Sequence, residues 1–289
     1  MTLVDIDAEQ LKQCRNRVQP IINDYIVKRE QPFRVEVFTG SVDYFSSRLQ
    51  ALDAFVAIEL IEHLYPAELE RLPYNVFHLI RPQIAIFTTP NSDYNPLFAT
   101  LPAEKFRHDD HKFEWSREEF RDWAENLIER FPQYSLSVQG IGPPPVGAEV
   151  YGCCSQAAVF IREEDPADGA EVTAEEISYY NSGSQFGEYE LIAEQEYPYD
   201  ERTRDEKICD LAKYHINQME HRSRMEERDD YSVPFRLEID LERLVEQISG
   251  EYSTTVEELK DILKVNNVTI EEMKVIVVSD VESEEEYSE

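Results

Sequence analysis

Two carboxylates and a histidine follow an apolar run near residue 58. The run Ala54–Ile58 leads directly into Glu59, Glu62 and His63. If a helix begins there, the spacing i, i+3, i+4 places the three side chains on one face. Open α/β sheets bind ligands at the carboxyl ends of their strands, where this segment would lie. The pattern indicates a metal site, with a solvated helical face carrying a chance histidine as the alternative.

A second group of chemically active residues lies in the ten residues 106–115. It contains His108 and His111 among acids, bases and aromatic residues. The segment precedes a predicted helix and therefore forms the loop after the strand predicted at 84–88. In a parallel sheet with adjacent strands, this loop leaves from the same edge as Glu59. One histidine from it would complete two oxygen and two nitrogen ligands, a set that suits Mg²⁺, Mn²⁺ or Co²⁺ better than Zn²⁺.

The elements that would position these residues alternate between apolar strands and amphipathic helices over residues 1–161. The expected strands are 33–39, 54–58, 84–88, 136–138 and 157–161, and the expected helices are 8–22, 69–80 and 117–130. Asp7 is predicted to cap the first helix, and Ser116 with Glu119 forms a capping box before the last. The inward positions of the first helix are predicted to be Leu11, Val18, Ile21 and Ile22. The alternation predicts an open, doubly wound α/β sheet in which the short apolar strands are buried on both faces.

The charge is concentrated in the second half of the chain. Of the net −32, residues 1–161 carry −8 (15 Lys and Arg against 23 Asp and Glu), which leaves −24 for residues 162–289. No broad basic face is visible, so any nucleic acid must be bound at a small local site. Residues 163–234 are predicted to form a flexible acidic linker, because 163–204 show no sustained period.

Helical patterning returns from residue 235. A short helix is expected there, followed by a second helix over 256–263 with Thr254 and Glu257 as its capping box, and then by a solvated acidic tail. The C-terminal region is therefore expected to be largely disordered or helical.

The cysteines and the hydropathy pattern indicate a cytoplasmic protein. Cys14, Cys153, Cys154 and Cys209 have neither the spacing of a disulfide framework nor that of a zinc site. No apolar run approaches the roughly 20 residues that a membrane span requires.

Three ordered blocks resemble the signature motifs of the small-RNA 2′-O-methyltransferases. They are Ala57-Ile-Glu-Leu-Ile-Glu-His-Leu64, Thr89-Pro-Asn-Ser-Asp-Tyr-Asn95 and Arg107-His-Asp-Asp-His-Lys-Phe-Glu-Trp-Ser-Arg-Glu-Glu-Phe120. The resemblance extends over residues 3–161, with Gly140-Ile-Gly142 and Gly152–Gln156 as later blocks. This family methylates the 3′-terminal ribose of piRNAs and siRNAs. The resemblance implies a class I (Rossmann-like) S-adenosylmethionine-dependent methyltransferase sheet.

The resemblance also assigns the metal ligands. Glu59, Glu62, His63 and His111 match the family's four ligand positions, whereas His108 falls at a position without that role. The implied ion, Mg²⁺ or Mn²⁺, holds both hydroxyls of the terminal ribose. His63 or His111 is the expected catalytic proton acceptor.

The cofactor site is expected to be partial. Asp5 matches the residue that binds the cofactor ribose, and Ser41 matches a contact near the adenine. The strand, Gly-rich loop and helix that precede these positions in the family are absent from the chain. Residues 1–162 are therefore expected to form an N-terminally truncated catalytic domain with weak affinity for S-adenosylmethionine.

Substrate contacts are expected in the histidine-bearing loop. Arg107, Lys112 and Arg117 could bind the terminal phosphate, and Trp115 could stack on the last base. Phe113 and Trp115 are, however, interpreted first as core anchors of the loop, because aromatic side chains are often buried. The expected partners are the 3′ end of a single-stranded small RNA and a Piwi or Argonaute protein that holds it. Two alternatives stay open, a non-catalytic interaction protein and a metal-dependent phosphoesterase.

Overall fold

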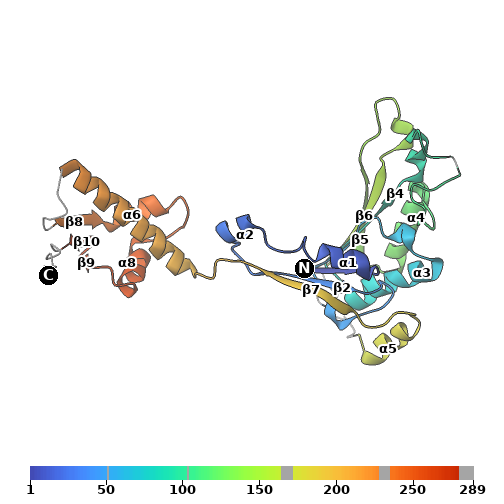
Figure 1. Ribbon diagram of the computed structural model, residues 1–289, viewed down its shortest axis with the longest axis horizontal. Coiled ribbons are helices and arrows are strands. Elements are labelled where there is room, and N and C mark those ends of the chain that lie inside the picture. The colour runs from blue at the N-terminus through green and yellow to red at the C-terminus, as the bar shows by residue number, and fades with distance from the viewer. Residues whose placement is uncertain (51, 103, 164–171, 228–234, 280–289) are drawn as a thin grey trace, which may run out of the picture. The chain divides into compact units, whose positions relative to one another are not determined.

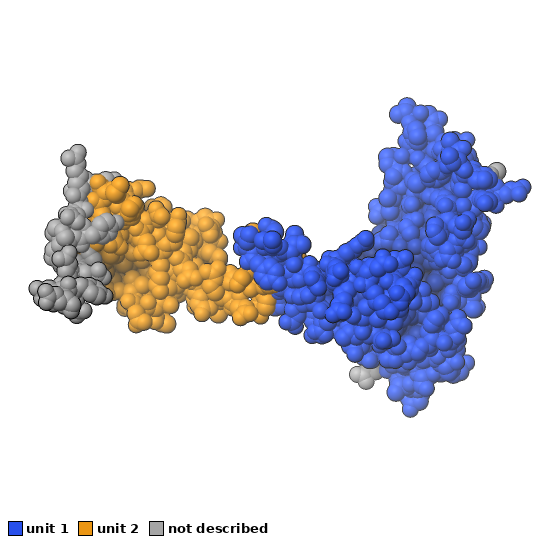
Figure 2. Space-filling view, viewed as in Figure 1, with its two compact units in different colours: residues 1–26, 32–197 blue, residues 27–31, 198–289 orange. Residues whose placement is uncertain are grey.

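The computed structural model describes residues 1–50, 52–102, 104–163, 172–227 and 235–279 (Figure 1). The chain divides into two compact units, which are coloured separately in Figure 2. Unit 1 comprises residues 1–26 and 32–197, and unit 2 comprises residues 27–31 and 198–289. The boundary predicted after residue 162 is therefore too early, because the first unit continues to Tyr197.

The first sheet of unit 1 has three strands in the order β1-β2-β7. The strands are β1 (Thr2–Asp5), β2 (Phe33–Thr39) and β7 (Glu190–Tyr197). β1 runs parallel to β2, and β7 pairs antiparallel with the other edge of β2. Val35 and Val37 of β2 are buried in one cluster with Leu11, which positions the N-terminal helix on this sheet.

The predicted helix over 8–22 is two separate helices in the structure, α1 (Ala8–Cys14) and α2 (Ile22–Ile26). Asp7 caps α1 as predicted, because its carboxylate accepts hydrogen bonds from two amides of the first turn. The inward assignment of Ile21 and Ile22 is wrong, since they are 67% and 80% exposed. Pro20 explains the break, because it lacks an N–H and disfavours helical conformation in the residue before it.

The second sheet of unit 1 has four strands in the order β3-β4-β6-β5. The strands are β3 (Ala54–Ala57), β4 (Ile84–Pro90), β5 (Tyr134–Ile141) and β6 (Ser155–Arg162). β3 and β4 are parallel as predicted, whereas β6 is antiparallel to both β4 and β5. β3 lies at the edge of this sheet and Val56 is 55% exposed, so burial of this strand on both faces is not observed.

Helices α3 (Pro66–Tyr74) and α4 (Arg117–Arg130) and the π-helical segment η3 (Asn75–Ile80) pack on this sheet. The bounds of α4 and its Ser116–Glu119 capping box are confirmed. Phe87 and Phe160 of the sheet share the main core with Phe77 and Phe120 from the helical segments. This core fixes the end of β4 relative to the loop that precedes α4.

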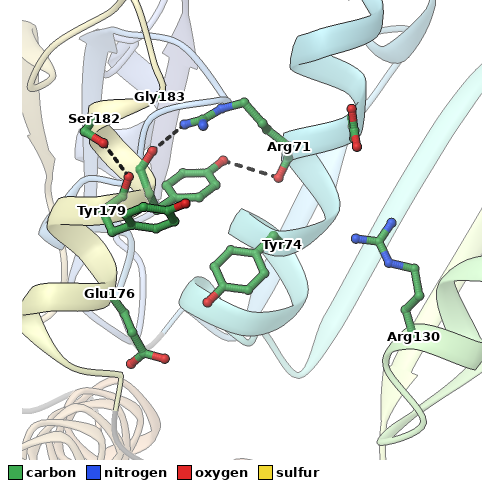
Figure 3. A pocket seen from close by; sticks show the side chains of 9 residues that line it. Arg71, Tyr74, Arg130, Glu176, Tyr179, Ser182 and Gly183 are labelled. Atoms are coloured by element: carbon green, nitrogen blue, oxygen red, sulfur yellow. Dashed lines mark hydrogen bonds between the residues drawn. The ribbon is translucent and has the colours of Figure 1, made fainter.

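The segment after residue 171 is folded, so the prediction of a flexible linker is wrong for the described residues. Helix α5 (Ala174–Ser182) packs against α3, as Figure 3 shows. The Arg71 guanidinium donates to the Tyr180 carbonyl at 2.7 Å, and the Tyr180 hydroxyl donates to the Arg71 carbonyl at 3.3 Å. The side chain of Asn181 exchanges two 2.9 Å hydrogen bonds with the backbone of Phe45.

Unit 2 is a small α/β fold with its own core. Its elements are α6 (Arg204–Glu227), β8 (Phe235–Asp240), α7 (Leu241–Ile248), α8 (Val256–Val265), β9 (Ile270–Glu271) and β10 (Lys274–Ser279). The antiparallel sheet has the order β8-β10-β9. The predicted helix from residue 235 thus begins six residues later, at Leu241, because β8 pairs with β10 and takes the first apolar residues into the sheet.

The second predicted helix of this region is confirmed as α8, but Thr255 caps it rather than Thr254. Among the described helices, none is both long and apolar enough to cross a bilayer. The strands and helices of both units confirm the α/β class.

Candidate functional site

The segment that carries the first three predicted ligands is a tight turn rather than an α-helix. Glu59 has φ 49°, a left-handed conformation that costs a non-glycine residue about 1–3 kcal/mol and persists only where the surroundings hold it. Residues Ile61–His63 then form a 3₁₀ turn. The shared helical face predicted from the i, i+3, i+4 spacing is therefore wrong, and other contacts position these side chains.

The carboxyl end of β4 supplies those contacts. The amide of Glu59 donates to the carbonyl and the hydroxyl of Thr88, at 3.2 and 2.9 Å, and that hydroxyl donates to Glu59 Oε1 at 3.1 Å. The next residue, Thr89, donates its hydroxyl to Glu62 Oε2 at 3.0 Å. Two adjacent threonines thus hold two of the predicted ligands at the predicted edge of the sheet.

Glu62 is a buried carboxylate with one oxygen left over. The residue is fully buried, and Oε1 accepts no hydrogen bond from any described residue. Burial raises the pKa of Glu62 to about 7, and the neighbouring charges of Glu59 and Glu114 act in the same direction. A buried charged oxygen without a donor is costly unless a cation neutralises it.

Three histidine side chains lie close together, and one of them, His63, directly follows Glu62. His63, His108 and His111 each offer a ring nitrogen, and these nitrogens all lie within 4.8 Å of one another. The ring centroids of His63 and His111 are 4.8 Å apart. The structure thus joins the predicted pair and adds His108, which the resemblance leaves outside the ligand set.

Two carboxylates orient the predicted histidine ligands. Nδ1 of His63 lies 3.1 Å from an oxygen of Asp110, and Nδ1 of His111 lies 2.6 Å from Oε1 of Glu114. Such contacts fix the tautomer of an imidazole and leave Nε2 to bind a metal, as is usual around protein metal sites. The amide of Lys112 donates to the carbonyl of Glu62 at 2.7 Å, which ties the histidine loop to the carboxylate segment.

Glu114 connects the histidines to the rest of the loop. Its side chain is buried and accepts from the Asn95 side chain and from the Arg107 amide, both at 2.6 Å, as well as facing His111. Burial alone would raise the pKa of Glu114, but these hydrogen bonds outweigh it, and the pKa lies below its usual value. Glu114 is therefore a carboxylate at neutral pH and favours a proton on Nδ1 of His111.

The donor set fits a divalent cation. The histidine nitrogens lie within 4.8 Å of one another, and acids set the tautomers of His63 and His111. Glu62, whose buried Oε1 has no donor among the described residues, is in the same 3₁₀ turn as His63, and Glu59 precedes that turn. Mixed oxygen and nitrogen sets of this kind suit Mg²⁺, Mn²⁺ or Co²⁺.

Replacing Glu114 by glutamine is expected to weaken Mn²⁺ binding roughly 10- to 100-fold, because His111 loses the acid that holds its ring and tautomer. Titration calorimetry with Mn²⁺ measures the change directly. Glu119→Gln is the matched control, since glutamine preserves the capping box of α4 and Glu119 makes its hydrogen bonds with Ser116. Equal Mn²⁺ affinity in both variants would show that Glu114 does not act on the ligand.

The two predicted cofactor-binding residues, Asp5 and Ser41, line the same cavity as His63. Asp5 and Ser41 share a cavity of about 280 Å³ with His63, Asp110 and Lys112. The Ser41 hydroxyl already donates to an oxygen of Asp43 at 2.7 Å. The Tyr189 hydroxyl, from the segment predicted to be a linker, donates to the Ser41 carbonyl at 3.0 Å.

The three predicted RNA-binding cations have different surroundings. Arg107 donates to the side chain of Asn95 and to backbone carbonyls of Asn91 and Cys154, which favours a role in holding the loop over contact with RNA. Arg117 donates to an oxygen of Asp93 and to the Val150 carbonyl. Of these three residues, Lys112 is the one that lines the cavity with His63.

The aromatic pair of this loop is structural. Phe113 and Trp115 have ring centroids 4.4 Å apart and pack against the main core, as the anchoring interpretation predicts. Sequence reasoning missed Thr88, Asp110 and Glu114 as supports of the site. Their positions in the sequence could have indicated them. Asp110 and Glu114 are polar residues next to or near His111 in the same motif block, and Thr88 ends the strand predicted at 84–88.

Comparison with known proteins gives matches over both units. A family model described as the HEN1 methyltransferase C-terminal domain matches residues 205–279, which are the elements of unit 2. The small RNA 2′-O-methyltransferase of Drosophila melanogaster is 35% identical over 288 residues, covering 98% of this chain and 73% of the relative. The Gallus gallus and Rattus norvegicus proteins of the same name are 38% and 40% identical over 160 and 157 residues, and the chain spans about two fifths of their length (42% and 39%).

Solved structures match over a little more than half of the chain. A crystal structure of the small RNA methyltransferase HEN1 is 31% identical and covers 58% of this chain and 19% of that chain, with a TM-score of 0.44. The methyltransferase domain of a bacterial Hen1 is 29% identical over 55% of this chain and 76% of its own, also with a TM-score of 0.44. At this TM-score the assignment rests on the sequence relatives rather than on shape. The Drosophila match over nearly the whole chain shows that this protein belongs to the small RNA 2′-O-methyltransferase family.

Proposed function

We propose that this chain is a metal-dependent methyltransferase that transfers the methyl group of S-adenosylmethionine to the 2′ hydroxyl of the 3′-terminal nucleotide of single-stranded small RNAs, the piRNAs and siRNAs. Family membership supports RNA 2′-O-methylation. One observation supports the metal dependence: buried Glu62, in the same turn as His63, keeps an oxygen that has no donor among the described residues.

The residues divide the work by position. Glu59, Glu62, His63 and His111 would hold the ion, while Asp110 and Glu114 orient the two imidazoles. The chemistry supplied at these residues by a divalent cation, when bound, would be polarisation of a ribose hydroxyl, which lowers the pKa of that hydroxyl. Asp5 and Ser41 line the cavity that reaches His63, which would bring the methyl donor and the hydroxyl into line. His63 or His111 is the candidate proton acceptor.

Charge supports a partner that holds the RNA. A chain of net −32 repels the phosphate backbone, so affinity must come from the RNA end itself or from a second protein. We propose that a cytoplasmic Piwi or Argonaute protein presents the RNA 3′ end to this site.

A non-catalytic role is the second candidate, and the cofactor cavity favours it. Small-molecule pockets usually measure about 300–1,000 Å³, and the cavity at Asp5 and Ser41, about 280 Å³, lies just below that range.

The test uses the full chain with labelled S-adenosylmethionine, Mn²⁺ or Mg²⁺, and a synthetic single-stranded RNA with a free 3′ end. Label should enter this RNA, which then resists periodate, and should not enter the same RNA with a 2′-O-methylated end. Periodate protection also excludes the phosphoesterase. A well-folded chain that neither binds S-adenosylmethionine in calorimetry nor transfers label would establish the non-catalytic role.

A further inference from the structure

A cavity of about 740 Å³ lies beside the histidine site and is not used by the mechanism above. It is formed by the 3₁₀ segment η4 (Ser92–Leu97), the loop that follows it, and one residue of the histidine loop. Its principal side chains are those of Asn95, Phe98, Lys105, Phe106 and Glu114. The volume is within the usual range of small-molecule sites.

Two aromatic side chains on this cavity remain accessible. Phe98 is 37% exposed and Phe106 is 45% exposed, a substantial fraction for residues of this type. Phe98 is supported from behind by the ring of Tyr94, with centroids 5.5 Å apart, and by the guanidinium of Arg107, 4.9 Å from its centroid. These contacts hold an aromatic surface in place before any ligand arrives.

The described backbone of this loop is also held by hydrogen bonds. The amide of Phe98 donates to the Asn95 carbonyl, that of Leu101 to the Phe98 carbonyl, and that of Lys105 to the Pro102 carbonyl, at 3.0 to 3.1 Å. Successive turns with two prolines leave little conformational entropy to lose on binding.

A single carboxylate separates this cavity from the histidines. Glu114 lines the cavity, faces Nδ1 of His111 through Oε1, and accepts from Asn95, another lining residue, through Oε2. A ribose held at the histidine site therefore has the cavity next to it.

We propose that this cavity is the subsite for the nucleobase of the RNA 3′ end, stacked on Phe98 and Phe106 with Lys105 near the phosphate. The proposal rests on the function proposed above. Stacking on aromatic rings accepts every base, because each has a π-face, and it needs no broad basic surface. It accounts for RNA binding by an acidic chain through one small site.

The test uses RNA that carries 2-aminopurine as its 3′-terminal base, whose fluorescence is quenched when it stacks on an aromatic ring. The full chain with Mn²⁺ should quench it, and Phe106→Ala and Phe98→Ala should lose the quench and bind the RNA about 10-fold more weakly each. Phe106→Leu keeps an apolar side chain and should lose the quench too. Tyr179→Ala removes an exposed aromatic residue of unit 1 outside this cavity and should behave as wild type.

A second substrate separates this proposal from the function on which it rests. RNA that ends in an abasic ribose should bind the wild-type chain about 10-fold more weakly than normal RNA does. The abasic RNA should bind Phe106→Ala and the wild-type chain with the same affinity. Equal binding of abasic and normal ends by the wild type, or an unchanged quench in both alanine variants, would overturn the subsite. Methyl transfer to an abasic end at the normal rate would also overturn the subsite, but it would support the methyltransferase function. If the wild-type chain quenches the fluorescence, Phe106→Ala does not, and no methyl transfer is detected, the subsite would be supported and the methyltransferase function would not.

Discussion

Glu62→Gln should abolish methyl transfer, with a fall of at least about 1,000-fold, and yet make the metal-free protein more stable at pH 8. The loss of activity follows from the loss of a negatively charged ligand, since a metal ion supplies several kcal/mol of transition-state stabilisation. The gain in stability follows from removal of a buried charge whose oxygen Oε1 has no donor among the described residues.

The stability effect has a definite pH dependence. The pKa of Glu62 is about 7 in the folded chain against 4.5 for an unperturbed glutamate, so between these values the folded state keeps a proton that the unfolded state has released. Stability therefore falls as the pH rises through this window, by up to about 3 kcal/mol in total. Above pH 7 both states have lost the proton and the contribution stays constant.

Urea unfolding in EDTA at pH 5 and pH 8 measures this difference. Wild type should lose stability between the two values, and Glu62→Gln should lose about 2.5 kcal/mol less, because part of the window lies below pH 5. Glu125→Gln, on the exposed face of α4, is the matched control and should follow wild type. Identical pH dependence in wild type and Glu62→Gln would mean that Glu62 ionises normally, and that the orphaned oxygen is not the ion-binding feature.

The sequence predicted the frame of this site well because that frame depends on local signals. The apolar runs at β3 and β4 and the capping box of α4 are local, and their bounds are close to those observed. The position of Glu59 and Glu62 is not local, because it depends on hydrogen bonds from Thr88 and Thr89 of the neighbouring strand. The spacing of the ligands was informative, but the helix used to interpret it does not form.

The acidic segment after β6 could not be predicted from its own pattern. β7 has no continuous apolar face, and it is a strand because the free edge of β2 offers seven residues to pair with. Strand preference is decided by such neighbours more than by the residues themselves. The tyrosines of the segment, Tyr180 and Tyr189, were the overlooked signal, since both are buried against residues near the predicted cofactor position.

Truncation at the two alternative boundaries should therefore give opposite results. A chain of residues 1–198 should fold, whereas a chain of residues 1–163 should be aggregated or lack a cooperative transition. The shorter chain leaves one edge of β2 unpaired and uncovers Phe38 and Phe45, which Tyr180 and Tyr189 otherwise cover. Each large apolar side chain returned to water costs about 1.5–3 kcal/mol, so the sum is comparable to a total stability of about 5–15 kcal/mol.

Size-exclusion chromatography and thermal unfolding by circular dichroism distinguish these outcomes. The matched control is residues 1–198 with Tyr179→Ala, because Tyr179 is in the same helix but 85% exposed, and it should unfold like the unmodified 1–198 chain. Tyr180→Ala in 1–198 should lower stability by about 3 kcal/mol or more, as for other buried aromatic residues. A 1–163 chain that unfolds cooperatively at the same temperature as 1–198 would contradict this and restore the boundary at residue 162. Tyr189 also donates to the Ser41 carbonyl. Loss of the segment after residue 163 should therefore weaken cofactor binding at Asp5 and Ser41 more than metal binding at the histidines.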